Sequence, residues 1–218
     1  MLLPFFLGAQ PDKYQRFSAF GYTGVNLAQI EGDSYSGYNK IGARAGIGVN
    51  ILWSPKIYTS LGFGFSQLGS QASRSEQSED AGAAIDLRLN TVELPLLFHF
   101  RLGDTKATTR KTNYGLYRSG EIQIGVAVNR TTGRRVKELG IIELLTEKEN
   151  YTAELENYEN LDLQLLFGAS LQFSLKSGLF LQYGRSLSGI YRYEGIDPDA
   201  VPTLQPYFLS VGYRHTVY

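Results

Sequence analysis

The side chains best suited to acid–base or metal chemistry are scarce in this sequence. Its 218 residues include two histidines, His99 and His215, and no cysteine. Neither histidine has a serine and an aspartate at the spacing of a known nucleophilic triad, and two histidines on separate segments are poor evidence for a metal site. Without cysteine there is no thiolate nucleophile, thiolate ligand or disulfide. The sequence therefore predicts no catalytic residue, no metal and no cofactor, and hence a protein that is not an enzyme.

Two glycine-rich triplets, Gly46-Ile47-Gly48 and Gly62-Phe63-Gly64, could be taken for fragments of a phosphate-binding loop. A phosphate-binding loop joins a strand to a helix. Each triplet instead lies inside a segment that alternates between apolar and small residues, and no helical pattern follows it. We attribute both triplets to close packing inside a sheet.

The segment 130–159 carries a dense run of charge, with basic residues at its start and glutamates after them. Such a loop could bridge divalent cations, bind lipopolysaccharide or dock a protein. Charged runs are usually solvated and no metal-loop motif is present, so an extended, solvated loop is the simpler interpretation. The residues that would make contacts, if the loop binds a partner, are Arg134, Arg135, Glu138, Glu143, Glu147 and Glu149.

The segments around these residues alternate with a period of two. From Ile41 to Trp53 the odd positions are apolar and the even positions are mostly glycine, arginine or asparagine, as expected for a strand with two unlike faces. The same pattern recurs in residues 57–66, 92–102, 121–129, 161–175 and 207–214. It is weaker in 16–29 and 178–192, where Tyr22 and Arg185 fall on unexpected faces. The sequence predicts an all-β fold of eight antiparallel strands.

Alternation alone fits a soluble barrel as well as a membrane barrel. The eight lysines all fall in turns, loops or strand ends, whereas the water-facing side of a soluble barrel would be expected to carry them. The polar faces are rich in glycine, serine, glutamine and asparagine, which suits a crowded lumen. The apolar runs cover the roughly 9–11 residues that a tilted membrane strand needs, and none approaches the roughly 18–20 of a membrane helix. We therefore expect an eight-stranded antiparallel transmembrane β-barrel in the bacterial outer membrane.

The connections and the start of the chain agree with this location. Short turns at 54–56 and 176–178 are typical of periplasmic ends, and longer polar connections at 30–39, 73–86, 130–159 and 193–204 are typical of extracellular loops. Residues 1–9 are apolar and end in small side chains, like a secretory signal peptide, which leaves 10–218 as a single barrel domain. Lysine plus arginine (21) equals aspartate plus glutamate (21), so nucleic acid is not an expected partner.

Three runs of the sequence resemble a known family. They are Gly24-Val25-Asn26-Leu27, the glycine-rich second and third predicted strands, and Glu93-Leu94-Pro95-Leu96-Leu97. The final Val211-Gly212-Tyr213-Arg214-His215-Thr216-Val217-Tyr218 is separately similar to the terminal signal by which barrels in general are recognised for insertion. In the first three runs the chain resembles the PorT-like outer-membrane β-barrels of the Bacteroidetes, small barrels of OmpA or OmpX type. The resemblance implies, through the best-known member, a connection with type IX secretion. Because Pro95 cannot donate to a ladder, a bulge or bend is expected there.

Charges on the polar faces should pair, because an unpaired charge in a poorly hydrated interior is costly. Counted from the periplasmic strand ends, Arg44 and Glu93 stand at equal height and should meet across the lumen. Arg101 and Glu121 lie low on neighbouring strands and should form a second pair, with His99 close by. The full set expected in the lumen is Arg44, Glu93, His99, Arg101, Glu121, Asp162 and Arg214.

The leading functional hypothesis is a non-enzymatic barrel that acts through its extracellular loops, as a scaffold, an adhesin or a component of secretion machinery. Its expected partners are outer-membrane lipid, lipopolysaccharide and other envelope or secretion-system proteins. A membrane enzyme would need a nucleophile and a base at the outer rim, and the sequence offers none that can be named. A narrow passive pore is limited by geometry, because eight strands enclose a lumen that side chains just fill.

Overall fold

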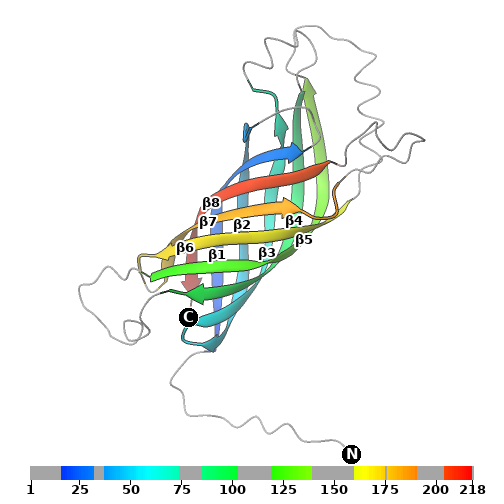
Figure 1. Cartoon of the computed structure of the whole chain (residues 1–218). Coiled ribbons are helices and arrows are strands. Elements are labelled where there is room, and N and C mark those ends of the chain that lie inside the picture. Colours follow the sequence, from blue (N-terminus) through cyan, green and yellow to red (C-terminus); the bar gives the residue numbers. More distant parts are fainter. Residues whose placement is uncertain are drawn as a thin grey trace, which may run out of the picture.

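The computed structural model describes residues 16–31, 37–73, 85–102, 119–138, 160–174, 176–190 and 204–217. Its strands are β1 (Phe17–Glu31), β2 (Lys40–Ser54), β3 (Ile57–Gln71), β4 (Ile85–Arg101), β5 (Ser119–Glu138), β6 (Leu161–Gln172), β7 (Ser177–Ser186) and β8 (Gln205–Val217). Each strand pairs antiparallel with its chain neighbour and β1 pairs with β8, so the sheet closes into a barrel (Figure 1). The expected fold is confirmed. No helix among the described residues is long and apolar enough to cross a membrane.

The alternation in the sequence becomes the two faces of the barrel wall. On β3, Leu61, Phe63 and Phe65 are 38–56% exposed, whereas Ser60 and Ser66 are buried in the lumen. Each of the other seven strands likewise carries exposed large apolar or aromatic side chains. An apolar exterior around a polar interior is the reverse of a soluble barrel and is the pattern of outer-membrane barrels.

The two residues on unexpected faces each have a structural reason. Tyr22 lies in the lumen, where a Cβ atom added at Gly46 or Gly64 would come within 2.5 or 2.1 Å of its hydroxyl oxygen. These glycines therefore leave room for the tyrosine, which supports close packing as the role of the glycine-rich triplets. Arg185 lies on the outer side of the wall, 47% exposed, and its Nη2 donates to Glu31 Oε2 at 2.6 Å.

β4 and β5 extend further than the alternation predicts. β5 continues to Glu138, so residues 130–138 are strand, and the expectation that all of 130–159 forms a loop is wrong. The register of β4 with β5 shifts beside Asn90, which marks a β-bulge. The extra residue is Thr132 on β5, so the outward positions of β5 shift by one residue beyond it. Residues 139–159 lie outside the described residues.

The top of β5 rises above its other neighbour. β5 pairs with β6 only as far as Arg130, opposite Leu161, and beyond this point its ladder partner is β4. We call residues 85–90 of β4 and 131–138 of β5 the upper ribbon. It projects from the barrel at the loop end (Figure 1).

Pro95 does not produce the expected bulge. Leu61 pairs with Leu96 and Gly64 pairs with Glu93, so the register of β3 with β4 is the same on both sides of the proline. The two residue pairs between them drop out of the ladder. The missing N–H of the proline thus removes hydrogen bonds locally, but the register of the two strands does not change.

The short connections lie together at one end of the barrel. Residues 55–56 join β2 to β3, and residues 173–176 join β6 to β7. In each turn a serine hydroxyl, of Ser54 or Ser174, accepts hydrogen bonds from the backbone N–H groups two and three residues later. The start of β1 and the end of β8 lie at this same end. By the polarity usual in outer-membrane barrels, this is the periplasmic end.

We expect the folded protein to migrate faster on electrophoresis without boiling than after boiling, because the closed ladder resists detergent until it is heated. Protease added to the protein in proteoliposomes should cut only in the connections. Mass spectrometry of the protected fragments checks this, with the boiled protein as the control for accessible sites. Complete digestion of the unboiled, reconstituted protein would exclude an embedded barrel.

Candidate functional site

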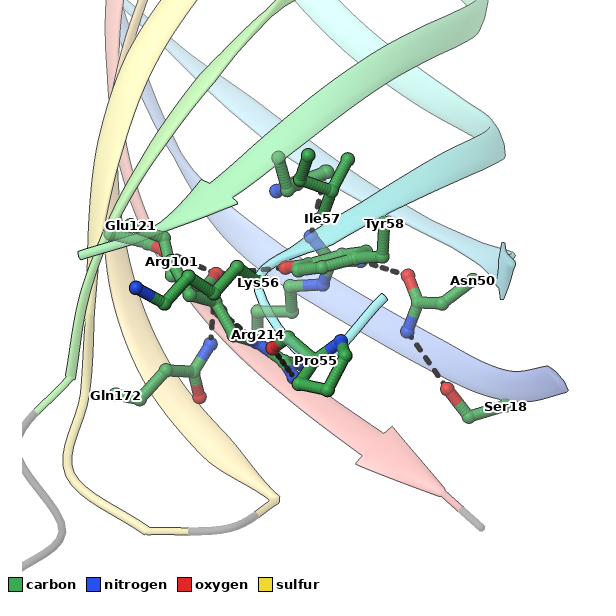
Figure 2. A network of polar contacts seen from close by, with 12 residues as sticks. Ser18, Asn50, Pro55, Lys56, Ile57, Tyr58, Arg101, Glu121, Gln172 and Arg214 are labelled. Carbon is green, nitrogen blue, oxygen red and sulfur yellow. Dashed lines mark hydrogen bonds and ion pairs between the residues drawn. The ribbon is translucent and has the colours of Figure 1, made fainter. Parts of the chain in front are cut away.

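The lower lumen is organised around Glu121, which is 1% exposed. Its carboxylate accepts hydrogen bonds from Tyr58 Oη at 2.8 Å, Ser170 Oγ at 3.0 Å and Gln172 Nε2 at 3.4 Å. Arg101 Nε donates to the other oxygen at 3.1 Å, so the ion pair expected from the sequence is formed. Figure 2 shows the side chains of Tyr58, Arg101 and Gln172 pointing toward Glu121, and the four residues come from four strands. A buried carboxylate is thus satisfied by one charge and three neutral donors.

His99 is packed beside this cluster. Its ring is fully buried and stacks on Tyr58, with 4.2 Å between the ring centroids. Its Nε2 lies 2.7 Å from Ser60 Oγ and 3.5 Å from Arg214 Nη1. The expectation that His99 lies near the lower ion pair is met, because Tyr58 touches both.

The Ser60–His99 contact is a serine and a histidine within hydrogen-bond distance, which spacing along the chain did not reveal. It lacks the other parts of a catalytic triad. Within the described ranges no group hydrogen-bonds His99 Nδ1 to orient the ring. Arg214 sits against the same Nε2 that would have to take the serine proton, and its charge opposes formation of an imidazolium. The pair is better suited to packing than to nucleophilic catalysis.

We therefore expect Ser60 to remain unlabelled when the folded protein is treated with a fluorophosphonate probe. Ser60 is 1% exposed, and no group among the described residues orients the His99 ring as its base. Labelling is read by mass spectrometry, and Ser60→Ala provides the matched control. Labelling of the folded wild type that disappears in Ser60→Ala would establish an activated serine and contradict this assignment.

Arg214 is 8% exposed and has no salt bridge among the residues that the structure describes. Its Nη2 donates to Asn50 Oδ1 at 2.5 Å, and Asn50 Nδ2 in turn donates to Ser18 Oγ (Figure 2). The guanidinium also lies 3.9 Å from the centroid of the Phe20 ring. A cation–π contact and an amide oxygen thus replace the carboxylate expected from the sequence.

The upper lumen contains the second predicted pair. Arg44 Nε donates to Glu93 Oε1 at 2.8 Å, and both side chains are at most 3% exposed. Tyr22 Oη donates to the same carboxylate oxygen at 2.6 Å, and Arg44 Nη1 donates to Gln182 Oε1 at 2.5 Å. The pair therefore joins residues of β1, β2, β4 and β7 across the barrel.

Asp162 pairs with no arginine in the part of the chain that the structure describes, in contrast to the expectation that all lumen charges pair with one another. Its carboxylate accepts from Ser186 Oγ at 2.5 Å, Ser188 Oγ at 2.9 Å and Gln164 Nε2 at 2.8 Å. Three neutral donors at the loop end of β6 and β7 supply the hydrogen bonds that the carboxylate lost on leaving water.

Between the two charged clusters lies a cavity of about 40 Å³. Its lining includes Arg44 on one side and Arg214 on the other, with Ser60, Gln123 and Gln182 between them. A water molecule needs roughly 10–15 Å³ of such space, so the cavity holds about three. The charged clusters above and below it fill the lumen with paired side chains.

The remaining candidates are distributed over three places. Arg134, Arg135 and Glu138 lie on β5 in the upper ribbon and not in a loop, because β5 is longer than expected. Glu143, Glu147 and Glu149 lie outside the described residues. His215 lies low on β8 with its Nδ1 3.0 Å from Ser177 Oγ. Among the described residues no three His, Cys, Asp or Glu side chains gather as metal ligands would.

A closed barrel of eight strands with an apolar exterior and a filled, charged lumen defines a transmembrane barrel of the bacterial outer membrane. The chain belongs to the family described as outer membrane protein beta-barrel domain, whose model matches residues 9–192. The family match and the fold together establish the outer membrane as its location.

Solved structures of similar fold come from several outer-membrane proteins. Ail, the attachment invasion locus protein of Yersinia pestis, was solved with the heparin analogue sucrose octasulfate; it is 10% identical over 93% of this chain and 99% of that chain, with a TM-score of 0.45. Neisserial surface protein A is 12% identical over 90% of this chain and 96% of that chain, with a TM-score of 0.46. The outer membrane enzyme PagL is 11% identical over 91% of this chain and 98% of that chain, with a TM-score of 0.44. A search of the curated proteins finds no match.

Proposed function

We propose that this protein is a non-enzymatic outer-membrane barrel whose extracellular end serves as an interaction surface for other envelope proteins. The observation that carries the proposal is the upper ribbon, in which β5 rises beyond the end of β6 and, among the described residues, has β4 as its ladder partner. In the ribbon, Thr132 and Arg135 are exposed. A strand edge that rises above the membrane offers both backbone groups and side chains to a partner.

The resemblance to PorT-like barrels of the Bacteroidetes supports a place in a secretion or envelope assembly. In such an assembly the barrel would act as a membrane-anchored scaffold. The packed lumen fits this role, because a filled barrel is a rigid support for the ribbon. The Ser60–His99 contact does not favour the enzymatic alternative, for the reasons given above.

Photo-crosslinking in native outer membranes tests the proposal. A photoreactive amino acid at Thr132 should capture a discrete protein neighbour, while the same residue at Val126, which faces outward in the apolar band of β5, should capture lipid. Recovery of the Thr132 variant without any protein adduct, in membranes where the protein is abundant, would refute the proposal.

A passive pore is the second functional alternative, and the lumen argues against it. Conductance in planar bilayers should be very small or absent, because the Arg44–Glu93 and Arg101–Glu121 pairs block the lumen above and below a cavity for about three waters. Single-channel recording of the purified, folded protein checks this against a protein-free bilayer. Large, stable current steps would show that the lumen opens.

A further inference from the structure

Three arginines occupy the outer side of β4 and β5 where the apolar band ends. On β4 the outward side chains from Leu102 to Val92 are apolar or aromatic. This run covers about 33 Å of strand at roughly 3.3 Å per residue, or about 25 Å of membrane depth at the usual tilt, which equals the height of a typical apolar band. Arg130 is the cross-strand neighbour of Val92 and is exposed. It therefore lies at the extracellular boundary of the membrane.

The other two arginines stand opposite each other just above this boundary. Arg88 pairs in register with Arg135. Leu87 and Leu89, on either side of Arg88, pack in the core at the top of the lumen, so Arg88 points outward. Arg135 is exposed. The pair lies four residues above Val92 on β4, or about 13 Å of strand, which two arginine side chains can span.

Like charges directly opposite on neighbouring strands are unfavourable unless something neutralises them. None of the three arginines has a salt bridge among the described residues. Arg185, on the other side of the barrel, also points outward near the loop end, but there Glu31 supplies a carboxylate at 2.6 Å. Within the described ranges, the chain thus neutralises one outward arginine with its own carboxylate, whereas the three on β4 and β5 have no carboxylate partner there.

We propose that Arg88, Arg130 and Arg135 bind the phosphate groups of lipid headgroups in the outer leaflet. Phosphate oxygens are acceptors that guanidinium groups bind in pairs of parallel hydrogen bonds. The arginines lie at the height where headgroups meet the apolar band, so a lipid already in the leaflet brings its phosphate to them. This inference goes beyond the proposed function, because it requires only that the barrel is embedded and not that the ribbon binds a protein.

Lipid retention measured by native mass spectrometry tests the inference. The full chain is reconstituted in phosphatidylcholine nanodiscs that contain bisphosphorylated lipid A, with EDTA present so that metal ions do not bridge charges. Wild type should retain the lipid on release from the disc, and Arg88→Gln/Arg130→Gln/Arg135→Gln should retain at least about tenfold less. Arg185→Gln is the matched control and should behave as wild type.

Two further comparisons distinguish lipid phosphate from free inorganic phosphate. They also provide a test that does not depend on the folding of a variant. Dephosphorylated lipid A should not be retained by wild type, a comparison that needs no variant, and millimolar inorganic phosphate should not displace lipid A. Equal retention of both lipids, equal retention by the triple variant, or displacement by inorganic phosphate would each overturn the inference. So would the absence of retention by wild type, the result expected if the acidic stretch after Glu138 neutralises the arginines. Failure of the crosslinking at Thr132 would leave these measurements unaffected.

Discussion

Replacing Glu93 with glutamine should destabilise the barrel by about 3–5 kcal/mol, because it leaves the buried Arg44 guanidinium without a counter-charge. Arg44 is 3% exposed and Glu93 1%, so bulk water does not reach the pair, and the few waters that fit the cavity beside Arg44 carry no counter-charge. Glutamine keeps the shape and can still accept one hydrogen bond, which isolates the effect of the charge. The measurement is the free energy of unfolding in detergent or lipid by urea titration.

Arg44→Met should also destabilise, and Arg44→Met/Glu93→Gln should cost less than the sum of the two single changes, because the double variant buries no unpaired charge. Glu31→Gln is the matched control. It makes the same chemical change in an ion pair whose partners are 47% and 55% exposed, and exposed pairs contribute at most about 1 kcal/mol. Additive losses in the double variant would show that Arg44 and Glu93 do not stabilise the fold as a pair.

The lower and middle parts of the barrel could be predicted from the sequence because lipid imposes a strict rule there. Every residue of a spanning strand faces either lipid or lumen, so alternation identifies the face, and counting from the turns identifies the height. That count was sufficient to pair Arg44 with Glu93 and Arg101 with Glu121. Both pairs lie below the bulge beside Asn90, and the register shift of β2 with β3, between Leu52 and Ser54, lies at the turn where the count begins.

The rule fails where the strands leave the membrane. Above the bulge, the outward face of the upper ribbon no longer faces hydrocarbon, so arginine is allowed there and the segment resembles a loop in sequence, although Leu89 still packs in the core. The partners of Arg214 and Asp162 were also beyond prediction. No sequence pattern indicates that Asn50 takes the place of a carboxylate beside Arg214, or that Ser186 takes the place of an arginine beside Asp162. These contacts depend on which side chains the closed barrel brings within reach.

Substituting alanine for Gly184 should destabilise the barrel, although the change adds no charge or polar group and only fills space. Gly184 lies opposite Phe208 on β8. A Cβ at this position would lie 2.4 Å from both Cε1 and Cζ of the Phe208 ring and 2.9 Å from Leu166 Cδ2. Phe208 is completely buried, and the Arg44 guanidinium lies 5.3 Å from its ring centroid. The ring therefore has little room to move, and any shift would disturb the Arg44–Glu93 pair.

The expected loss for Gly184→Ala is about 1–3 kcal/mol, the usual cost of overpacking a filled interior. Phe208→Leu removes the two ring atoms that clash, so Gly184→Ala/Phe208→Leu should unfold at nearly the same urea concentration as Phe208→Leu alone. Gly21→Ala is the matched control, because its Cβ would have as nearest neighbour the Gly46 carbonyl oxygen at 3.7 Å. That substitution should leave stability unchanged or slightly raised, since alanine restricts the unfolded chain more than glycine. If Gly184→Ala were as neutral as Gly21→Ala, the upper lumen would be looser than this packing requires, and the Arg44–Glu93 pair would have room to move apart.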